Sequence, residues 1–195
     1  NVGLFGWIFN GSPIQNVGLI DNDITGRNQV GGLAGSVSTA IISNAYTTGI
    51  VNGNTAVGSL VGEASNANMI YLYATGAVNG SSNVGGLIGT THDVAIGDSY
   101  TTALVSGSSN VGGLVGSVSL TNITSSYWDI DTTGQATSAG GLGTGLNTAD
   151  AFTQANYTGF DFTSTGDWFI VDGFTRPMLR SEYSTTITNA HQLQL

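Results

Sequence analysis

Two pairs of aspartates have the spacing of a calcium-binding loop. Each pair occupies alternate positions just ahead of a glycine, and the four residues are Asp21, Asp23, Asp129 and Asp131. Oxygen ligands at alternate positions, followed by a glycine turn, are what Ca²⁺ prefers. The acid expected at the twelfth loop position is instead glycine in both stretches, Gly32 and Gly140. The ligand set is incomplete, so calcium is kept only as an alternative.

The remaining polar residues do not form a recognisable catalytic set. Glycoside hydrolysis needs two carboxyl groups about 5 to 9.5 Å apart, and Asp93 and Asp98 lie in a single stretch of chain. A lyase would want a basic residue or a calcium cluster, and Arg27 is the one base in the repeats. His92 and His191 are isolated, and a lone histidine is usually a surface or satisfied residue. We predict no catalytic residues and a protein that is not an enzyme.

The charge balance argues against nucleic acid as a partner. Twelve acids face three bases, all of them arginine, and the net charge is −9. A phosphate backbone or an anionic membrane would be repelled. The chain has no cysteine, which excludes disulfides and thiolate metal sites. It also has no long apolar run and no leader, so we expect no membrane insertion. Because it starts with Asn1, we interpret it as an excised piece of a longer protein.

The chain repeats itself every 27 residues. Six columns keep this step without an insertion, and one of them is Val30, Val57, Val84 and Val111. A second column is Tyr46, Tyr73, Tyr100 and Tyr127. A degenerate copy begins at Val2, so there are five motifs. A fixed period of 20 to 50 residues is typical of solenoids and propellers.

The content of one repeat selects between these two architectures. A propeller blade needs roughly 40 residues or more, which 27 cannot supply. Each repeat is rich in short β-forming pieces and has no amphipathic run long enough for a helix. We predict an all-β fold, a parallel β-helix (β-solenoid) with one repeat per turn. Valine and leucine columns would fill its interior, and glycine columns would supply corners and positive φ angles.

The columns give a second interpretation of the aspartates. Asp21 and Asp129 occupy equivalent places on the first and last turns, where the turns between carry Thr48, Thr75 and Thr102. Carboxylates on terminal turns discourage end-to-end strand pairing. We prefer this interpretation and expect no metal or cofactor. An ice-binding threonine file is disfavoured, because the neighbouring file contains alanine and tryptophan.

The tyrosine column and four glycosylation sequons also have two interpretations each. The tyrosines could form an exposed stripe that stacks on sugars, but a stacked ladder that holds the coil together is favoured. The sequons begin at Asn10, Asn79, Asn122 and Asn156. Glycosylation there is an alternative to turn-forming asparagine, which we prefer.

Four stretches carry a family resemblance: VGGLAGSVS, VGSLVGEAS, VGGLIGTTH and VGGLVGSVS. Together with the strand after each of them, they resemble the GLUG repeat. The segment from SSYWDIDTTG to GFTRPMLRSEY resembles the segment located after such repeats in filamentous haemagglutinin-like exoproteins of Gram-negative bacteria. This resemblance implies a right-handed parallel β-helix within a large secreted or surface-bound adhesin, exported by two-partner secretion.

The columns end after Gly134, where the composition changes. Residues 148–155 predict a short helix capped by Thr148 or Asn147, with Phe152 packed inward. The aromatic residues from Phe160 to Phe174 predict a hairpin or a pair of short strands that serves as a lid over the last open turn. We therefore divide the chain into a solenoid at 1–134, a capping region at 135–182 and a strand re-entering or flanking the solenoid at 183–195.

These observations favour a non-catalytic, mechanical role: a rigid stalk that presents an adhesin on the outer surface of a bacterium. The first alternative is a module that binds carbohydrate or a host protein. The second is a subunit of a self-assembling extracellular filament. The expected partners are a host-cell glycan or protein reached through the parent adhesin, or neighbouring solenoid segments.

Overall fold

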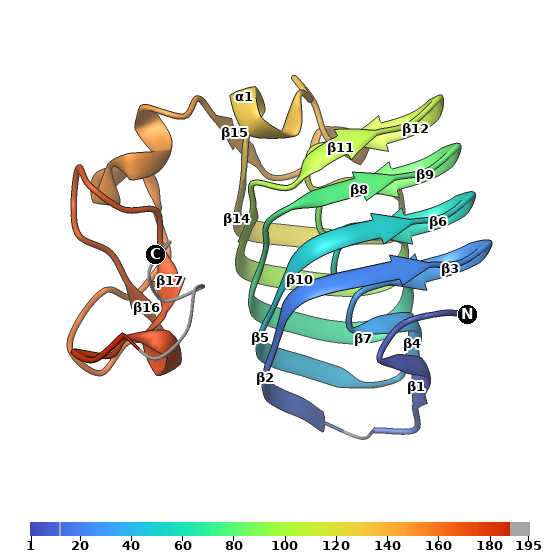
Figure 1. The fold of residues 1–195 in the computed structure, drawn as a ribbon, viewed down its shortest axis with the longest axis horizontal. Helices are drawn as coiled ribbons and strands as arrows, with labels where there is room; N and C mark the ends of the chain where they lie inside the picture. Colours follow the sequence, from blue (N-terminus) through green and yellow to red (C-terminus); the bar gives the residue numbers. More distant parts are fainter. Residues whose placement is uncertain (12, 188–195) are drawn as a thin grey trace.

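The protein is a parallel β-solenoid with a C-terminal region beside it (Figure 1). The computed structural model describes residues 1–11 and 13–187. The strands of the coils are β1 (Phe5–Phe9), β2 (Pro13–Thr25), β3 (Asn28–Gly31), β4 (Ala34–Ser38), β5 (Ile41–Asn52), β6 (Thr55–Gly58), β7 (Val61–Ala74), β8 (Ala77–Asn79), β9 (Ser82–Gly85), β10 (Ile88–Thr101), β11 (Leu104–Ser106), β12 (Ser109–Gly112), β13 (Val115–Ser119) and β14 (Asn122–Asp129). The solenoid prediction is confirmed.

The elements after β14 are short. They are α1 (Ile130–Thr133), η1 (Ala139–Gly141), β15 (Thr144–Leu146), η2 (Asp150–Phe152), η3 (Gln154–Asn156), β16 (Trp168–Phe169), β17 (Met178–Leu179) and η4 (Arg180–Glu182). Of these, β15 continues the large parallel sheet, because it pairs with β14. The antiparallel pair β16–β17 forms a small sheet of its own.

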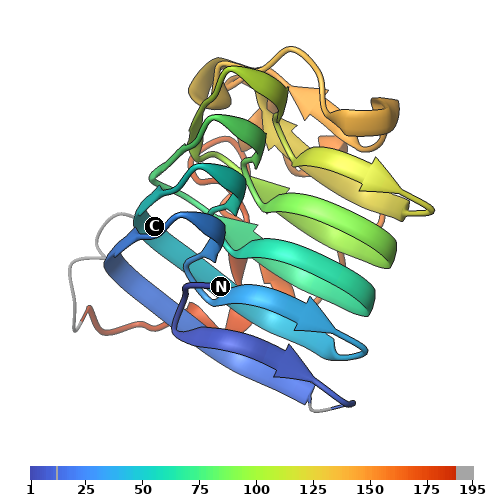
Figure 2. The same ribbon diagram turned by 90° about the vertical axis from the view of Figure 1, so that its right-hand side faces the viewer.

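Equivalent side chains lie directly over one another along the rod. Val57 pairs in register with Val30 below and with Val84 above, in the sheet formed by β3, β6, β9 and β12. Tyr73 pairs likewise with Tyr46 and Tyr100 in the large sheet. Figure 2 shows the coils stacked as parallel ribbons. The 27-residue period of the sequence is therefore one coil of the structure.

Two apolar columns fill the interior of the coils. The leucine column is completely buried, with exposed fractions of 0% at Leu33, Leu60, Leu87 and Leu114. Val30, Val57 and Val84 form part of a separate valine cluster. Full burial of one such side chain contributes roughly 1.5 to 3 kcal/mol relative to exposure, so the columns are a principal source of stability.

The glycine columns act mainly through close backbone approach. A Cβ on Gly85 would lie 2.0 Å from the Ile88 carbonyl oxygen, and one on Gly58 would lie 2.2 Å from that of Val61. The expectation of positive φ holds at Gly49 and Gly76, at 111° and 98°. Most other glycines of the repeat columns have ordinary φ angles. Their missing side chains leave room for the tight corner of their own coil and for the backbone of the next one, as at Gly58 beside Val61 and Gly89.

Left-handed corners are instead formed by residues other than glycine. Three columns recur in this conformation with φ between 43° and 57°: Gln29, Ala56, Asn83 and Asn110; Thr39, Asn66, Asp93 and Leu120; Asn44, Tyr71, Asp98 and Ser125. Such angles are uncommon outside glycine, asparagine and aspartate. Each full coil therefore turns three times through backbone that most side chains disfavour.

Residues 130–146 close the C-terminal end of the solenoid. Ile130 and Leu142 pack against the main apolar core. Ser138 Oγ accepts hydrogen bonds from the backbone N–H groups of Leu114 and Val115 at 3.3 and 2.9 Å. This segment, and not the aromatic region, covers the last coil.

The aromatic C-terminal region packs against the side of the coils. Its cluster contains Tyr157, Phe160, Trp168, Ile170 and Leu179, together with the column residues Tyr73, Tyr100 and Tyr127. The predicted lid over the open turn is therefore wrong in position. The tyrosine column offers a wide lateral apolar surface, and the aromatic rings bury it. The ribbon of this region lies beside the coils (Figure 1).

The local predictions for this region hold in part. The helix expected at 148–155 is instead two short 3₁₀ turns, η2 and η3, separated by Thr153 in an extended conformation. The N-cap residue of the first turn is Ala149 rather than Thr148 or Asn147, although Asn147 Oδ1 accepts from the Asp150 N–H at 2.8 Å. The hairpin exists, but it pairs Trp168 with Leu179 rather than lying wholly within 160–174. Residues 183–187 form no strand, and 188–195 lie outside the described residues.

Candidate functional site

The tyrosine column forms a stacked ladder. The ring centroids of Tyr46 and Tyr73 are 4.9 Å apart with planes 4° from parallel, and those of Tyr73 and Tyr100 are 5.4 Å apart at 12°. Tyr73 and Tyr100 are 0% and 4% exposed. The expected ladder is thus present, and its buried rings leave no open sugar-stacking stripe at these two positions.

The C-terminal region accepts hydrogen bonds from the hydroxyls of this ladder. Tyr73 donates to Oε2 of Glu182 at 2.7 Å, and Tyr127 donates to the carbonyl of Thr158 at 2.8 Å. Tyr100 donates to the carbonyl of Pro177. Burial, and then the charge of Glu182, raise the pKa of Tyr46 to about 12. The hydroxyls remain protonated donors at neutral pH.

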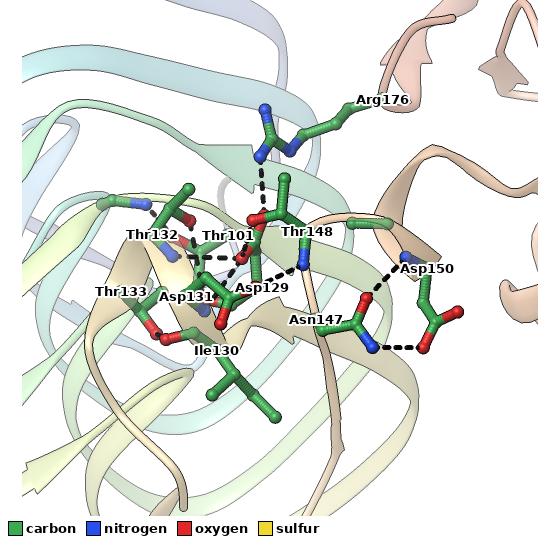
Figure 3. A network of polar contacts seen from close by, with 12 residues as sticks. Thr101, Asp129, Ile130, Asp131, Thr132, Thr133, Asn147, Thr148, Asp150 and Arg176 are labelled. Atoms are coloured by element: carbon green, nitrogen blue, oxygen red, sulfur yellow. Dashed lines mark hydrogen bonds and ion pairs between the residues drawn. The ribbon is translucent and has the colours of Figure 1, made fainter. Parts of the chain in front are cut away.

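Asp129 is the centre of a second polar network, drawn in Figure 3. Its carboxylate accepts from the N–H groups of Asp131 and Thr132 at 3.0 and 3.1 Å and so caps α1. The Thr148 hydroxyl approaches it at 2.9 Å, and Nη2 of Arg176 pairs with Oδ2 at 2.6 Å. Asp129 is the end of a β-strand, the cap of a helix and an anchor of the C-terminal region at once.

The electrostatics of Asp129 follow from these contacts. Its side chain is 1% exposed, and burial alone would raise its pKa. The hydrogen bonds from Arg176, the Thr132 N–H and Thr148, with the charge of Arg176, outweigh burial and hold the pKa of Asp129 below its ordinary value. The carboxylate is therefore ionised and engaged with protein groups on both oxygens.

The other residues of the calcium alternative lie apart from this network or at its rim. Asp21 and Asp23 are exposed on the first coil, in β2, and the Asp21 N–H donates to Thr48 Oγ1 at 2.8 Å. Asp131 is exposed and accepts from the Thr148 N–H at 2.8 Å. Within residues 1–11 and 13–187, no group of three or more His, Cys, Asp or Glu side chains is placed to hold a metal ion.

The residues weighed for catalysis are dispersed. His92 is exposed on β10, beside Ser65 and Ser119 of the adjacent coils. Asp93 and Asp98 occupy different left-handed corners. Arg27 is exposed at the first coil, and His191 lies outside the described residues. The structure brings none of these described residues together in a catalytic arrangement.

The threonine file and the sequons have distinct surroundings. Thr75 and Thr102 lie beneath the C-terminal region, opposite Phe152 and Phe174, and so do not form an open flat array. Asn10 and Asn122 are exposed. The side-chain amide of Asn79 donates to Oδ1 of Asn52 at 2.9 Å, and that of Asn156 donates to the Asp150 carbonyl at 3.0 Å.

Arg176 and Glu182 are functional residues that the sequence pattern did not single out. They join the C-terminal region to the solenoid through contacts 47 and 109 residues apart along the chain. A weak signal was available: Arg176 is one of only three bases, and it stands in an apolar context. The residues that Arg176 and Glu182 contact could not be predicted from the sequence. The C-terminal region is not repetitive, so no repeat shows which of its residues lie beside which residues of the coils.

Comparison with known proteins gives two findings. Residues 53–79 match the GLUG motif family. The crystal structure of a "putative immunoglobulin A1 protease" from Bacteroides ovatus superposes with a TM-score of 0.65 at 21% identity. The match covers 90% of this chain and 62% of that chain. No curated protein matches this sequence. At this identity, the likeness shows the fold alone.

Proposed function

We propose that this chain is a non-catalytic scaffold, a rigid segment that extends and presents a bacterial adhesin at the outer surface of the cell. The GLUG motif and the β-solenoid fold fit an extracellular repeat protein. No helix in the described part of the chain is long and apolar enough to cross a membrane. The filamentous haemagglutinin resemblance supplies the adhesin and the two-partner secretion parts of the proposal.

One observation carries the mechanical part: the lateral bracing of the coils. A bare stack of coils bends or frays one coil at a time, because each coil contacts only its neighbours. Here the C-terminal region packs across three successive tyrosines, Tyr73, Tyr100 and Tyr127, and hydrogen-bonds each of them. The brace therefore couples three coils into one cooperative unit.

Single-molecule pulling between the two ends of the chain tests this proposal. We expect the coils joined by the brace to unfold together, in one event. The variant Phe160→Ala, which weakens the brace, should divide that event into smaller steps at lower force. Stepwise loss of single coils in the unchanged protein would contradict the rigid-scaffold role.

A proteolytic role must be weighed, since the structural neighbour is described as a protease. Within the described residues, the one histidine is His92, whose exposed side chain has no hydrogen bond or ion pair with another described residue. A peptidase assay on a broad casein substrate should show no cleavage. Cleavage that is abolished by His92→Ala would overturn the scaffold assignment.

One observation at the N-terminal end of the solenoid, opposite the end that residues 130–146 cover, favours the filament alternative. Within the described residues, β1 pairs only with β4, and β2 pairs only with β5. Trp7 and Phe9 on β1 are 59% and 54% exposed. Exposed strand edges and apolar patches mark association sites. Concentration-dependent assembly in light scattering, lost in Trp7→Ser, would support this second candidate.

A further inference from the structure

A cavity of about 180 Å³ lies between the coils and the C-terminal region. Its walls include Thr75 and Thr102 from adjacent coils, Tyr100 from the ladder, and Phe152, Phe174 and Arg176 from the C-terminal region. Sites for drug-sized ligands measure roughly 300 to 1,000 Å³. This cavity therefore fits a ligand of a single ring.

The coil wall of the cavity carries two hydroxyl groups at a fixed separation. Thr75 and Thr102 are equivalent residues of neighbouring coils, so they stand about 4.8 Å apart, the spacing of strands in a sheet. Both are part-exposed, and neither side chain hydrogen-bonds to another described residue. Each hydroxyl is free to donate one hydrogen bond and to accept others.

The opposite wall carries a guanidinium whose orientation is fixed. Arg176 pairs with Asp129 through Nη2 at 2.6 Å, and its guanidinium carbon lies 4.8 Å from the centre of the Phe152 ring. Its Nε is buried and, among the described residues, has no hydrogen-bond partner. The side chain as a whole is 27% exposed and lines the cavity, so the guanidinium offers a ligand N–H groups other than this covered Nε.

Phe174 provides an aromatic surface at this cavity. Its side chain is 80% exposed, although the cluster of buried rings lies close by in the same region. Aromatic side chains that line a pocket are typical contacts for the apolar face of a ligand. The cavity thus combines hydroxyls, a planar donor and a phenyl ring.

The charges select among ring-shaped ligands. The positive charge of Arg176 is already matched by Asp129, and Glu182 lies at the Tyr73 hydroxyl on the same side. The whole chain carries −9. The negative charge of the chain would repel a carboxylate or phosphate at long range. Such a group would also find the guanidinium of Arg176 already paired with Asp129. A neutral ring bearing several hydroxyls meets every feature of the cavity.

We propose that this cavity binds one neutral monosaccharide unit of a glycan. The hydroxyls of the sugar pair with Thr75, Thr102 and the accessible part of the Arg176 guanidinium, and a C–H face of its ring lies against Phe174. The site is separable from the scaffold role, since Thr75, Thr102 and Phe174 take no part in the ladder and Asp129 contacts that brace the coils. A spacer with such a site would also hold a glycan along its side.

Amide NMR titration of the full chain tests the proposal. The probes are the methyl glycosides of glucose, galactose, mannose and N-acetylglucosamine, with glucuronic acid and benzoate as the charged-sugar and non-sugar comparisons. We expect at least one neutral glycoside to give saturable shifts at Thr75, Thr102 and Phe174. A dissociation constant on the order of 1 mM is reasonable for a single ring, corresponding to about −4 kcal/mol.

Variants separate this cavity from other surfaces. Phe174→Ala and Thr102→Val should each weaken binding at least fivefold, whereas Thr102→Ser keeps a hydroxyl and should bind within twofold of the unchanged protein. Phe9→Ala removes another exposed aromatic ring, on β1, and should leave affinity unchanged. Thermal unfolding of each variant shows whether it is folded.

Three outcomes would overturn the proposal: no saturable shift with any neutral glycoside, binding that Phe174→Ala and Thr102→Val leave intact, or tighter binding of glucuronic acid or benzoate. The pulling experiment contains no sugar, so a failure here is distinct from a failure of the scaffold role.

Discussion

The hydroxyl of Tyr73 donates a hydrogen bond of 2.7 Å to Oε2 of Glu182, a residue 109 positions later in the chain. Tyr73 is 0% exposed and lies in the middle of the stacked ladder. Oε1 of Glu182 accepts from the Leu179 N–H at 3.2 Å. The pair thus fixes the end of the C-terminal region against the third coil.

Tyr73→Phe should destabilise the protein by about 2 kcal/mol, because hydrogen bonds to charged groups contribute roughly 1.5 to 3 kcal/mol. Tyr127→Phe is the matched control. Its hydroxyl donates to a neutral carbonyl, that of Thr158, so about 1 kcal/mol is expected. Urea unfolding measures both variants. An equal or smaller loss in Tyr73→Phe would show that Glu182 does not brace the coils.

Acid should weaken the attachment at Asp129. Its pKa is lowered in the folded protein, so its contribution to stability is present above the unfolded value of 3.8 and is lost as pH falls through the lower folded value. Asp129→Asn removes this titration, and its stability should depend less on pH below 4. Urea midpoints measured between pH 2 and pH 6 test this expectation.

The same salt bridge makes Arg176 important at neutral pH. Removing one partner of a buried ion pair leaves an uncompensated charge and costs roughly 3 to 5 kcal/mol. Asp129 keeps its helix-capping and Thr148 hydrogen bonds, so the lower end of that range, about 3 kcal/mol, is expected for Arg176→Met. A loss below 1 kcal/mol would mean that those remaining bonds suffice.

Asp98 should show the opposite dependence on pH. Burial raises its pKa, a hydrogen bond with Ser125 opposes that rise, and the charge of Asp167 adds to it. Because the folded state holds this proton more tightly, the contribution of Asp98 to stability falls as pH rises from 3.8 through the raised value. Asp98→Asn should therefore flatten a slope of the opposite sign to that of Asp129, in the same urea series.

Leu60→Ala should cost about 2 to 5 kcal/mol, since it opens a cavity in the interior column. Leu60 is 0% exposed. Leu104→Ala on β11 is the control, because that side chain is 50% exposed and surface changes usually stay within about 0.5 kcal/mol. Comparable losses in the two variants, measured by urea unfolding, would contradict the leucine core.

Leu120→Asn should stabilise the protein by about 1 kcal/mol. Leu120 has a φ of 50° and is 77% exposed, and a left-handed backbone costs an ordinary residue roughly 1 to 2 kcal/mol, less for asparagine. Asn66 and Asp93 already occupy the same corner on the coils below. Leu104→Asn, outside the left-handed corners, should give no gain. A lower melting temperature for Leu120→Asn would contradict this.

The solenoid could be predicted from the sequence, because the repeat period shows which residues of successive coils lie over one another. Val57 and Val84 are separated by the same step as Tyr73 and Tyr100, and stacking the coils satisfies both columns at once. The left-handed corners were not readable in the same way. Tyr71 and Leu120 occupy such corners although their residue types disfavour them, because the paired residues on either side of each corner, such as Ile70 and Ser119, fix the path of the backbone.

The sequence by itself determined the length of a coil, the residues that fill it and the order in which coils stack, since each of these follows from a period of 27 residues. Only the tertiary structure decided where the C-terminal region lies. Its aromatic residues could bury themselves against an open end or against a side, and residues 130–146 already cover the end. The tyrosine ladder offered an apolar surface along the side, and the region packed there, which brought Arg176 to Asp129 and Glu182 to Tyr73.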